Sequence, residues 1–242
     1  MQDKLRGEEI LIIKNITREG PGIIEEILIE SGIKYTVVDL SLGQDIQPLD
    51  NYGAVIVLGG PDSANDSNPK MKRELALIRE VLNADIPYLG ICLGFQTLVH
   101  AAGGHVVKSK IKEVGFRDPD GEYFEVELTE DGQHDPLFAG LGLSFNVFHL
   151  HGETVNLAEN MQLLATGKFC QNQIVRAGSN AYGIQCHFEL TPEMFETWIK
   201  DDPDLQEIDR DILRSDFEVI KNNYTRTGYQ LFRNFLKIAG FL

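Results

Sequence analysis

The segment Gly-Ile-Cys-Leu-Gly at residues 90–94 constrains the fold more than any other part of this chain. A short apolar run, residues 88–91, leads into Cys92, and a stretch with helical character, residues 94–102, follows it. Glycines two positions before and after the cysteine allow a strained turn in which larger side chains would clash. A strand, a sharp turn and a helix in this order form a nucleophile elbow, which holds a reactive side chain at a helix N-terminus. That position favours a thiolate, so the pattern predicts a cysteine nucleophile.

A second segment, residues 182–189, supplies the partners that such a cysteine needs. It is predicted to be a strand that ends in His187, one further residue and Glu189. Residues two apart on a strand point to the same side, so the carboxylate would lie beside the imidazole. The carboxylate would orient the imidazole, and the imidazole would reach the thiol of Cys92, as in a nucleophile, base and orienter triad.

Two further segments complete a pattern of four, in a fixed order and spacing. They are Leu-Gly-Gly-Pro at residues 58–61 and His-Gly-Glu-Thr-Val at residues 151–155. Together with residues 90–96 and 187–189, they resemble the class I glutamine amidotransferases over roughly residues 8–200. Within that family, the chain is most similar to the stand-alone guanylate (GMP) synthase-like amidotransferases. Residues 170–173 and the long helical tail are the features that indicate this group.

The resemblance implies hydrolysis of the side-chain amide of glutamine to glutamate and ammonia. Cys92 would attack the amide carbon and form a γ-glutamyl thioester. His187 would take the thiol proton and later protonate the leaving ammonia, while Glu189 orients His187. The main-chain N–H groups of Gly60 and Leu93 would form the oxyanion hole. One such donor contributes about 100- to 1000-fold in rate. The glycine turn at residues 59–60 would therefore have a catalytic role as well as connecting two elements.

The same resemblance implies a substrate site for the amino-acid end of glutamine. Its residues would be Gly59, Gln96, Leu150, His151 and Gly152.

Three positions depart from the family pattern. Cys186 replaces the usual aromatic or glycine residue and should point away from the His187 face as a buried spectator. Phe95, where His or Met is more usual, is expected in the pocket wall. Glu153 replaces an Asp, which would lengthen the reach of that loop.

The alternation of apolar strands and amphipathic helices predicts an α/β fold with a mostly parallel sheet covered on both faces, which the resemblance makes flavodoxin-like. Strands are expected at 9–14, 35–40, 54–58 and 88–91, and helices at 21–31, 68–83 and 94–102. From 106 to 184 the pattern changes to strands, among them 123–128, 144–148, 162–165 and 173–176, as an antiparallel extension. A helix starts near residue 191, and one or two helices span 203–238.

Composition sets the remaining expectations. The 242 residues fit one amidotransferase domain over 1–242, with a core at about 8–200 and a helical extension at about 201–242. A net charge of −15 disfavours nucleic acid and anionic membrane as partners. Three sparse cysteines and a polar N-terminus without a signal-peptide core favour the cytoplasm.

No cofactor or metal is expected. His149 and His151 alternate along a strand, but no Cys or carboxylate pattern lies near them in the sequence.

Three functions stay open. The first is a glutaminase that passes ammonia to a separate synthetase subunit, since the chain carries no P-loop and no Ser-Gly-Gly-x-Asp-Ser loop for ATP; alternatively, no synthetase exists. The second is a γ-glutamyl peptidase or hydrolase with the same triad, because the thioester chemistry serves any γ-glutamyl leaving group. The third is a non-catalytic regulatory module that retains the fold.

Overall fold

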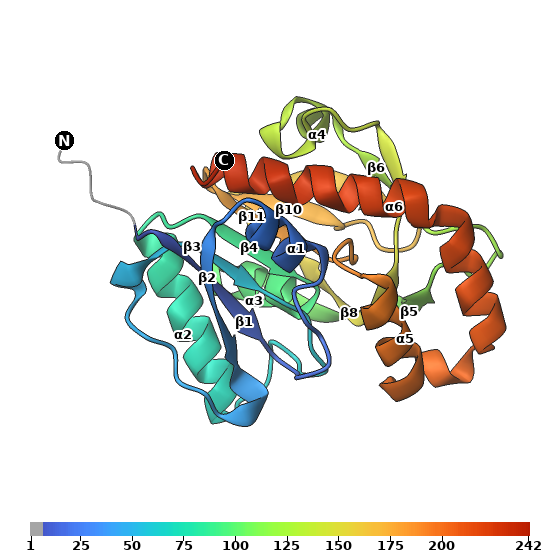
Figure 1. Cartoon of the computed structure of the whole chain (residues 1–242), viewed down its shortest axis with the longest axis horizontal. Coiled ribbons are helices and arrows are strands. Elements are labelled where there is room, and N and C mark those ends of the chain that lie inside the picture. The colour runs from blue at the N-terminus through green and yellow to red at the C-terminus, as the bar shows by residue number, and fades with distance from the viewer. Residues whose placement is uncertain (1–6) are drawn as a thin grey trace.

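A nine-stranded sheet forms the centre of the computed structural model, which describes residues 7–242 (Figure 1). The N-terminal residues 1–6, on which the expectation of a missing signal peptide partly depends, lie outside the described residues. Five strands run parallel in the order β2-β1-β3-β4-β11. Their bounds are β1 (Glu9–Lys14), β2 (Lys34–Asp39), β3 (Tyr52–Val57), β4 (Tyr88–Ile91) and β11 (Ala181–Ile184).

An antiparallel half continues the same sheet beyond β11. Its strands follow in the order β10-β9-β6-β7. Their bounds are β10 (Ile174–Ala177), β9 (Met161–Gly167), β6 (Glu125–Leu128) and β7 (Ser144–Asn146). The predicted α/β fold with an antiparallel extension is therefore confirmed.

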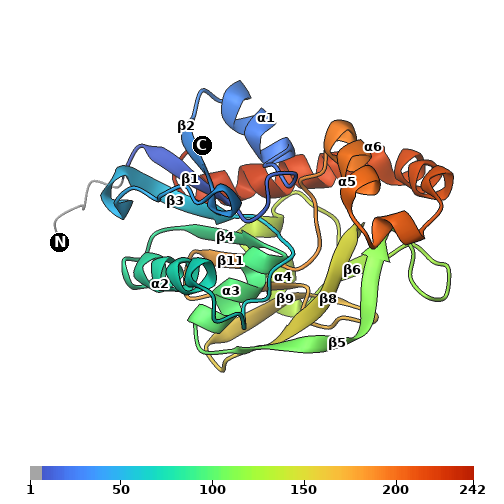
Figure 2. The same cartoon turned by 90° about the horizontal axis from the view of Figure 1, so that it is seen from below.

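Helices cover both faces of the sheet (Figures 1 and 2). One apolar core unites α1 (Ile23–Glu30), α5 (Pro192–Asp201) and α6 (Arg210–Ile238) with the sheet, and the other unites α2 (Pro69–Asn83) and α3 (Leu93–Ala101) with it. The two cores arise because successive side chains of a strand point to opposite faces of the sheet. Along β1, Ile10 and Ile12 enter the first core, while Leu11 and Ile13 enter the second. A short helix, α4 (Glu130–His134), joins β6 to β7.

Local signals explain where the helices begin. The side chain of Asn68 accepts a hydrogen bond from the N–H of Met71 at 2.9 Å and caps α2, as the sequence predicts. Thr191 caps α5 in the same way. After a single turn at Leu205–Glu207, the tail is one helix of 29 residues. None of the helices in residues 7–242 combines the length and apolar character that crossing a membrane requires.

The strand expected at residues 144–148 is too long. β7 ends at Asn146, and the chain then leaves the large sheet. The carbonyl of Phe148 accepts a hydrogen bond from the N–H of His187 at 2.9 Å. The chain continues as β8 (His149–Asn156), which pairs with β5 (His105–Gly115) in a separate two-stranded sheet. Part of the expected extension is therefore a second sheet.

The strand expected to carry His187 and Glu189 also ends early. β11 stops at Ile184, and His187 makes only an isolated bridge with Phe148. The carboxylate of Glu189 accepts a hydrogen bond from the N–H of Phe188 at 3.0 Å. The catalytic candidates therefore lie on a loop that follows the strand.

Candidate active site

Cys92 occupies the turn between β4 and α3 in a backbone conformation that non-glycine residues rarely adopt, with φ 51° and ψ −101°. The neighbouring glycines make this turn sterically feasible. A Cβ at Gly90 would lie 2.2 Å from the carbonyl oxygen of Gly94, and one at Gly94 would lie 2.1 Å from that of Val57. Cys92 is only 6% exposed, so its sulfur is reached only from the cavity beside it.

His187 and Glu189 form a buried hydrogen-bonded pair. The Nδ1 of His187 lies 2.6 Å from the Oε1 of Glu189, and the ring of Trp198 packs against the imidazole edge to face at 5.0 Å. Burial by itself would lower the pKa of His187. The charge of Glu189 and hydrogen bonds with Cys92 and Glu189 outweigh burial, so the pKa of His187 lies well above its usual value.

The glycine turn after β3 brings these groups together. A Cβ at Gly59 would lie 3.3 Å from the Cε1 of His187 and 3.5 Å from the Cβ of Cys92. A Cβ at Gly60 would lie 3.4 Å from the Cδ2 of Leu93. Leu93 is the first residue of α3, so its N–H has no partner within the helix. The turn therefore lies against Cys92, with Gly60 and Leu93 side by side.

Two amide side chains, of Gln185 and Gln96, form a connected set of contacts beside the sulfur of Cys92. The Nε2 of Gln185 lies 3.7 Å from the Sγ of Cys92, and its Oε1 lies 3.3 Å from the Nε2 of Gln96. Gln96 also donates to the carbonyl of Glu153 at 3.1 Å, while the carbonyl of Leu150 lies 3.7 Å from the sulfur. Gln185 was not among the predicted site residues. The sequence signal that could have identified Gln185 is its position as a polar residue directly after a fully apolar strand.

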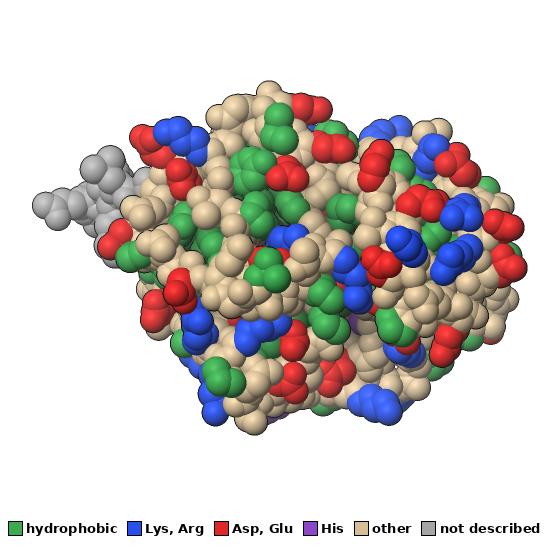
Figure 3. All heavy atoms as spheres, turned by 60° about the horizontal axis from the view of Figure 1, so that its bottom comes forward, with side chains coloured by type: hydrophobic (Ala, Val, Ile, Leu, Met, Phe, Trp, Pro, Cys, Tyr) green, Lys and Arg blue, Asp and Glu red, His purple; other side chains and the backbone are tan. Residues whose placement is uncertain are grey.

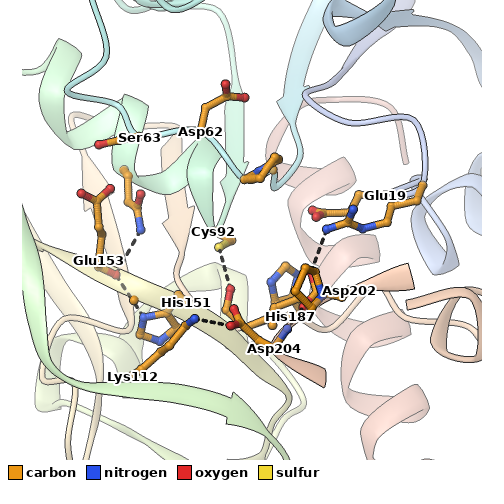
Figure 4. Close-up of a pocket in the computed structure, with 17 residues that line it drawn as sticks. Glu19, Asp62, Ser63, Cys92, Lys112, His151, Glu153, His187, Asp202 and Asp204 are labelled. Atoms are coloured by element: carbon orange, nitrogen blue, oxygen red, sulfur yellow. Dashed lines mark hydrogen bonds and ion pairs between the residues drawn. The ribbon is translucent and has the colours of Figure 1, made fainter. Parts of the chain in front are cut away.

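A half-open cavity of about 520 Å³ leads to Cys92 (Figure 4). His151 and Glu153 lie on one side of the sulfur in this view, and Glu19 and His187 on the other. Two ion pairs stand at the rim, Arg18 with Asp202 at 2.7 Å and Lys112 with Asp204. Of the predicted residues, seven line the cavity: Gly60, Cys92, Gln96, Leu150, His151, Gly152 and His187. Gly59, Leu93 and Glu189 lie behind this lining.

Glu19 is a site residue that the sequence analysis missed. Its side chain is buried beside the glycine turn, where a Cβ at Gly59 would lie 2.4 Å from its Oε2. Burial raises the pKa of Glu19 to about 7, with a lowering contribution from His187 and a raising one from Glu189. It sits in the loop after β1, where the sequence offers no pattern that marks it.

The three departures from the family pattern fall in different places. Cys186 is fully buried in the apolar core, as expected. The expectation that Phe95 belongs to the pocket wall is wrong, because Phe95 is buried on the far side of α3 against Gly183. Glu153 lines the cavity.

The sequence around His149 and His151 shows no carboxylate pattern, but the fold brings a carboxylate to them. Pairing of β5 with β8 brings Glu113 to them, with its Oε2 2.9 Å from the Nε2 of His151 and 4.0 Å from that of His149. The three side chains offer ligand atoms within 4.8 Å of one another.

Comparisons with known proteins agree with this geometry. Residues 22–202 match the model of the family described as glutamine amidotransferase class-I. The glutamine amidotransferase-like protein YfeJ of Salmonella typhimurium is 33% identical over 164 residues, 65% of this chain and 66% of that protein. One subunit of the glutamine-hydrolyzing GMP synthase of Methanosphaera stadtmanae is 34% identical over 167 residues, 65% of this chain and 78% of the relative.

A crystal structure of a glutamine amidotransferase from Thermotoga maritima superposes with a TM-score of 0.84 at 28% identity, over 96% of this chain and 97% of that one. The chain also matches GMP synthases from Thermosipho, but there it spans only 26–27% of the relatives' length. The family match covers the elbow, the glycine turn and the His187–Glu189 loop together. The resemblance and the enzyme class expected from the sequence are therefore confirmed: the chain belongs to the class I glutamine amidotransferase family.

Proposed function

We propose that this protein hydrolyses the side-chain amide of glutamine, with Cys92 as nucleophile, His187 as general base and acid, and Glu189 as the orienting group. One observation carries the proposal: a cysteine in a strained elbow at a helix N-terminus shares one cavity with His187, and Glu189 is hydrogen-bonded to His187 behind the cavity lining. These are the three roles that acyl transfer through a thioester requires.

The reaction proceeds in two halves. The thiolate of Cys92 attacks the amide carbon, a C–S bond forms, and the carbonyl electrons move to oxygen, where the N–H groups of Gly60 and Leu93 receive the charge. Collapse of this intermediate breaks the C–N bond, and His187 gives its proton to the leaving ammonia. Water then attacks the γ-glutamyl thioester and His187 takes a proton from it. The C–S bond breaks, which returns the thiolate of Cys92 and releases glutamate.

The cavity supplies contacts for the amino-acid end of glutamine. Gln96 and the main chain at Leu150, His151 and Gly152 lie beside the sulfur. The rim presents charges of both signs, with Arg18 and Lys112 for the α-carboxylate and Glu153 for the α-ammonium group. Orientation at both ends would hold the amide carbon over Cys92.

Ammonia made here would pass to a separate synthetase subunit. The name of the Methanosphaera relative, which describes one of the subunits of a GMP synthase, supports this part of the proposal. Acidic and basic side chains are interspersed over the face shown in Figure 3, which suits docking to another protein better than to nucleic acid. The three cysteines are free thiols, consistent with work in a reducing cytoplasm.

Release of glutamate and ammonia from glutamine tests the proposal, measured beside Cys92→Ala and Cys170→Ala. Cys170 is also a free buried thiol but does not line the cavity, so it is the matched control. Turnover that Cys92→Ala loses and Cys170→Ala keeps supports a glutaminase.

Parallel assays with γ-glutamyl dipeptides cover the second candidate, which the half-open mouth of the cavity favours. Turnover of dipeptides alone would establish a γ-glutamyl hydrolase instead. If neither substrate turns over and a glutamine-like electrophile does not alkylate Cys92, the protein is a non-catalytic module.

A further inference from the structure

Glu113, His149 and His151, called here the Glu–His–His cluster, lie on one face of the two-stranded sheet. Glu113 is directly opposite His151 in the β5–β8 ladder, and Gly115 is opposite His149. An irregularity in the ladder between Lys108 and Glu113 sets this register. Residues two apart and residues directly opposite share a face, so all three side chains converge, and each is at least 95% buried.

The hydrogen bonds of His151 leave a lone pair aimed at the carboxylate. Its Nδ1 lies 3.0 Å from the carbonyl oxygen of Glu153, which can only accept, so Nδ1 carries the proton. In the neutral ring the Nε2 is then an acceptor, yet it faces the Oε2 of Glu113 at 2.9 Å and has no donor of its own. Two acceptors in such contact need either a proton or a metal ion between them. A ring nitrogen that donates to a carbonyl while the other faces inward is the usual arrangement of a metal-bound histidine.

Gln173 closes the cluster from the loop before β10. Its amide group lies 3.4 Å from the Oε2 of Glu113 and 3.5 Å from the Nε2 of His149, whereas its Oε1 has no partner. Half a turn of this amide places the Oε1 at the centre of the cluster. Hydrogen-bond partners decide that orientation, and a central cation favours the oxygen.

We propose that Glu113, His149 and His151 bind a divalent zinc ion, with the side-chain oxygen of Gln173 as a fourth ligand. Two imidazoles and a carboxylate are a ligand set that suits zinc. Ligand atoms about 2.0–2.1 Å from a tetrahedral ion stand about 3.3 Å apart. The carboxylate-to-imidazole separations of 2.9 and 4.0 Å bracket this value, so small side-chain rotations complete the site.

An acidic cavity gives a cation a route to the cluster. A hollow of about 370 Å³ reaches Glu113 and is lined by four further carboxylates, Asp118, Glu122, Glu125 and Glu127. Lys168 also lines the hollow, and its ammonium group donates hydrogen bonds to Asp118 at 2.8 Å and to Asp120. Gly167 in the wall of the hollow adjoins the last ligand, because a Cβ there would lie 3.1 Å from the Nε2 of Gln173. The negative charge of this lining therefore attracts cations, and the hollow gives them an entry path to Glu113.

The zinc ion holds the wall of the glutamine cavity in place. Leu150, whose carbonyl lies 3.7 Å from the sulfur of Cys92, stands between the two histidines. The carbonyl of Glu153 accepts from both His151 and Gln96. A site closed by four side chains leaves no position for a substrate, so the metal acts on structure and not on the amide.

The test uses the full chain, free of any affinity tag, in a Cys92→Ala background that removes the one thiol able to bind zinc in the cavity. Protein dialysed against zinc and then against metal-free buffer is expected to retain one zinc ion per chain by elemental analysis. Cobalt(II) in its place is expected to show tetrahedral visible absorption without a sulfur-to-metal charge-transfer band. Retention of no zinc, or a sulfur charge-transfer band, overturns the proposal.

Variants locate the ion. Glu113→Gln and His149→Gln are each expected to weaken zinc binding by more than about 100-fold, since even changes behind the ligands cost about 10- to 100-fold. His134→Gln, exposed on α4, is the matched control and should bind as the parent does. Circular dichroism checks that each variant is folded. Equal zinc binding by the folded Glu113→Gln variant and the parent overturns the assignment, and the cobalt spectrum of the parent decides the matter if both variants fail to fold.

Discussion

The hydroxyl of Tyr224 donates a hydrogen bond to the main-chain carbonyl of His187, with 3.1 Å between the two oxygens. Tyr224 lies on α6, outside the family-matched residues 22–202. Gly228, one turn further along, allows the close approach of the helix, because a Cβ there would lie 2.4 Å from the carbonyl oxygen of Phe188. The C-terminal helix therefore fixes the loop that carries the proposed base.

Tyr224→Phe tests this support. Loss of the hydroxyl leaves the buried carbonyl of His187 without its partner, so we expect a loss of about 1–3 kcal/mol in the free energy of unfolding and a reduced kcat. Urea unfolding and glutamine turnover measure the two effects. Tyr229→Phe is the matched control on the same helix, since its hydroxyl bonds the exposed Glu26. Equal effects of the two variants would show that the contact to His187 adds nothing specific.

Glu189→Gln tests the orienting role. The amide keeps the shape of the side chain but removes the charge that raises the pKa of His187, so the imidazolium becomes less populated. We expect kcat for glutamine to fall by at least about 100-fold, as orienting carboxylates in such triads contribute up to about 10,000-fold. Glu193→Gln, exposed on α5, should leave turnover unchanged. Turnover of Glu189→Gln within about twofold of the parent would make Glu189 a structural residue.

Sequence patterns were informative where the chemistry is local. The elbow around Cys92 depends on glycines two positions before and after it and on a flanking strand and helix. β1 and β4 begin and end where the pattern places them, and α2 differs only by starting one residue later, after its cap Asn68. His187 and Glu189 are hydrogen-bonded as expected, although the strand proposed for them ends at Ile184.

Contacts made between distant segments were not predictable. Glu113 reaches His151 only because β5 and β8 leave the large sheet and pair with a shifted register. Glu19 reaches the cavity from a loop with no periodic pattern, and Tyr224 contacts the His187 loop from a helix whose spacing marks only its apolar face. In each case the tertiary fold, and no local propensity, decides which polar groups meet.

Glu74 makes folding stability depend on pH. It is fully buried on α2, and burial raises its pKa to about 7. A raised carboxyl pKa means that the folded chain binds more protons than the unfolded one between about pH 4.5 and 7, so the free energy of unfolding falls as pH rises through this window. Glu74→Gln should remove up to about 3 kcal/mol of that fall. Urea unfolding at pH 5 and pH 8 measures it, and the exposed Glu80→Gln on the same helix should keep the full dependence; an unchanged fall in Glu74→Gln would exclude this source.

Glu19 should shape the alkaline side of the activity profile. With a pKa of about 7, the buried carboxyl is neutral below that pH and charged above it. Its charge would then stand beside the glycine turn that we propose as part of the oxyanion hole, where negative charge opposes the transition state. We expect kcat to decline above pH 7, approaching about tenfold per pH unit. The pKa of His187 lies well above its usual value, so loss of its proton comes at higher pH.

Glu19→Gln keeps the shape of the side chain and cannot ionise. Its kcat should stay level above pH 7, where the parent declines, and the two profiles should converge in acid, because the parent carboxyl is neutral there. Glu30→Gln, exposed at the end of α1, is the control and should follow the parent. A Glu19→Gln variant that declines in step with the parent would assign the alkaline limb to another group. A variant that loses activity equally at every pH would show that Glu19 positions the glycine turn through its shape and not through its charge.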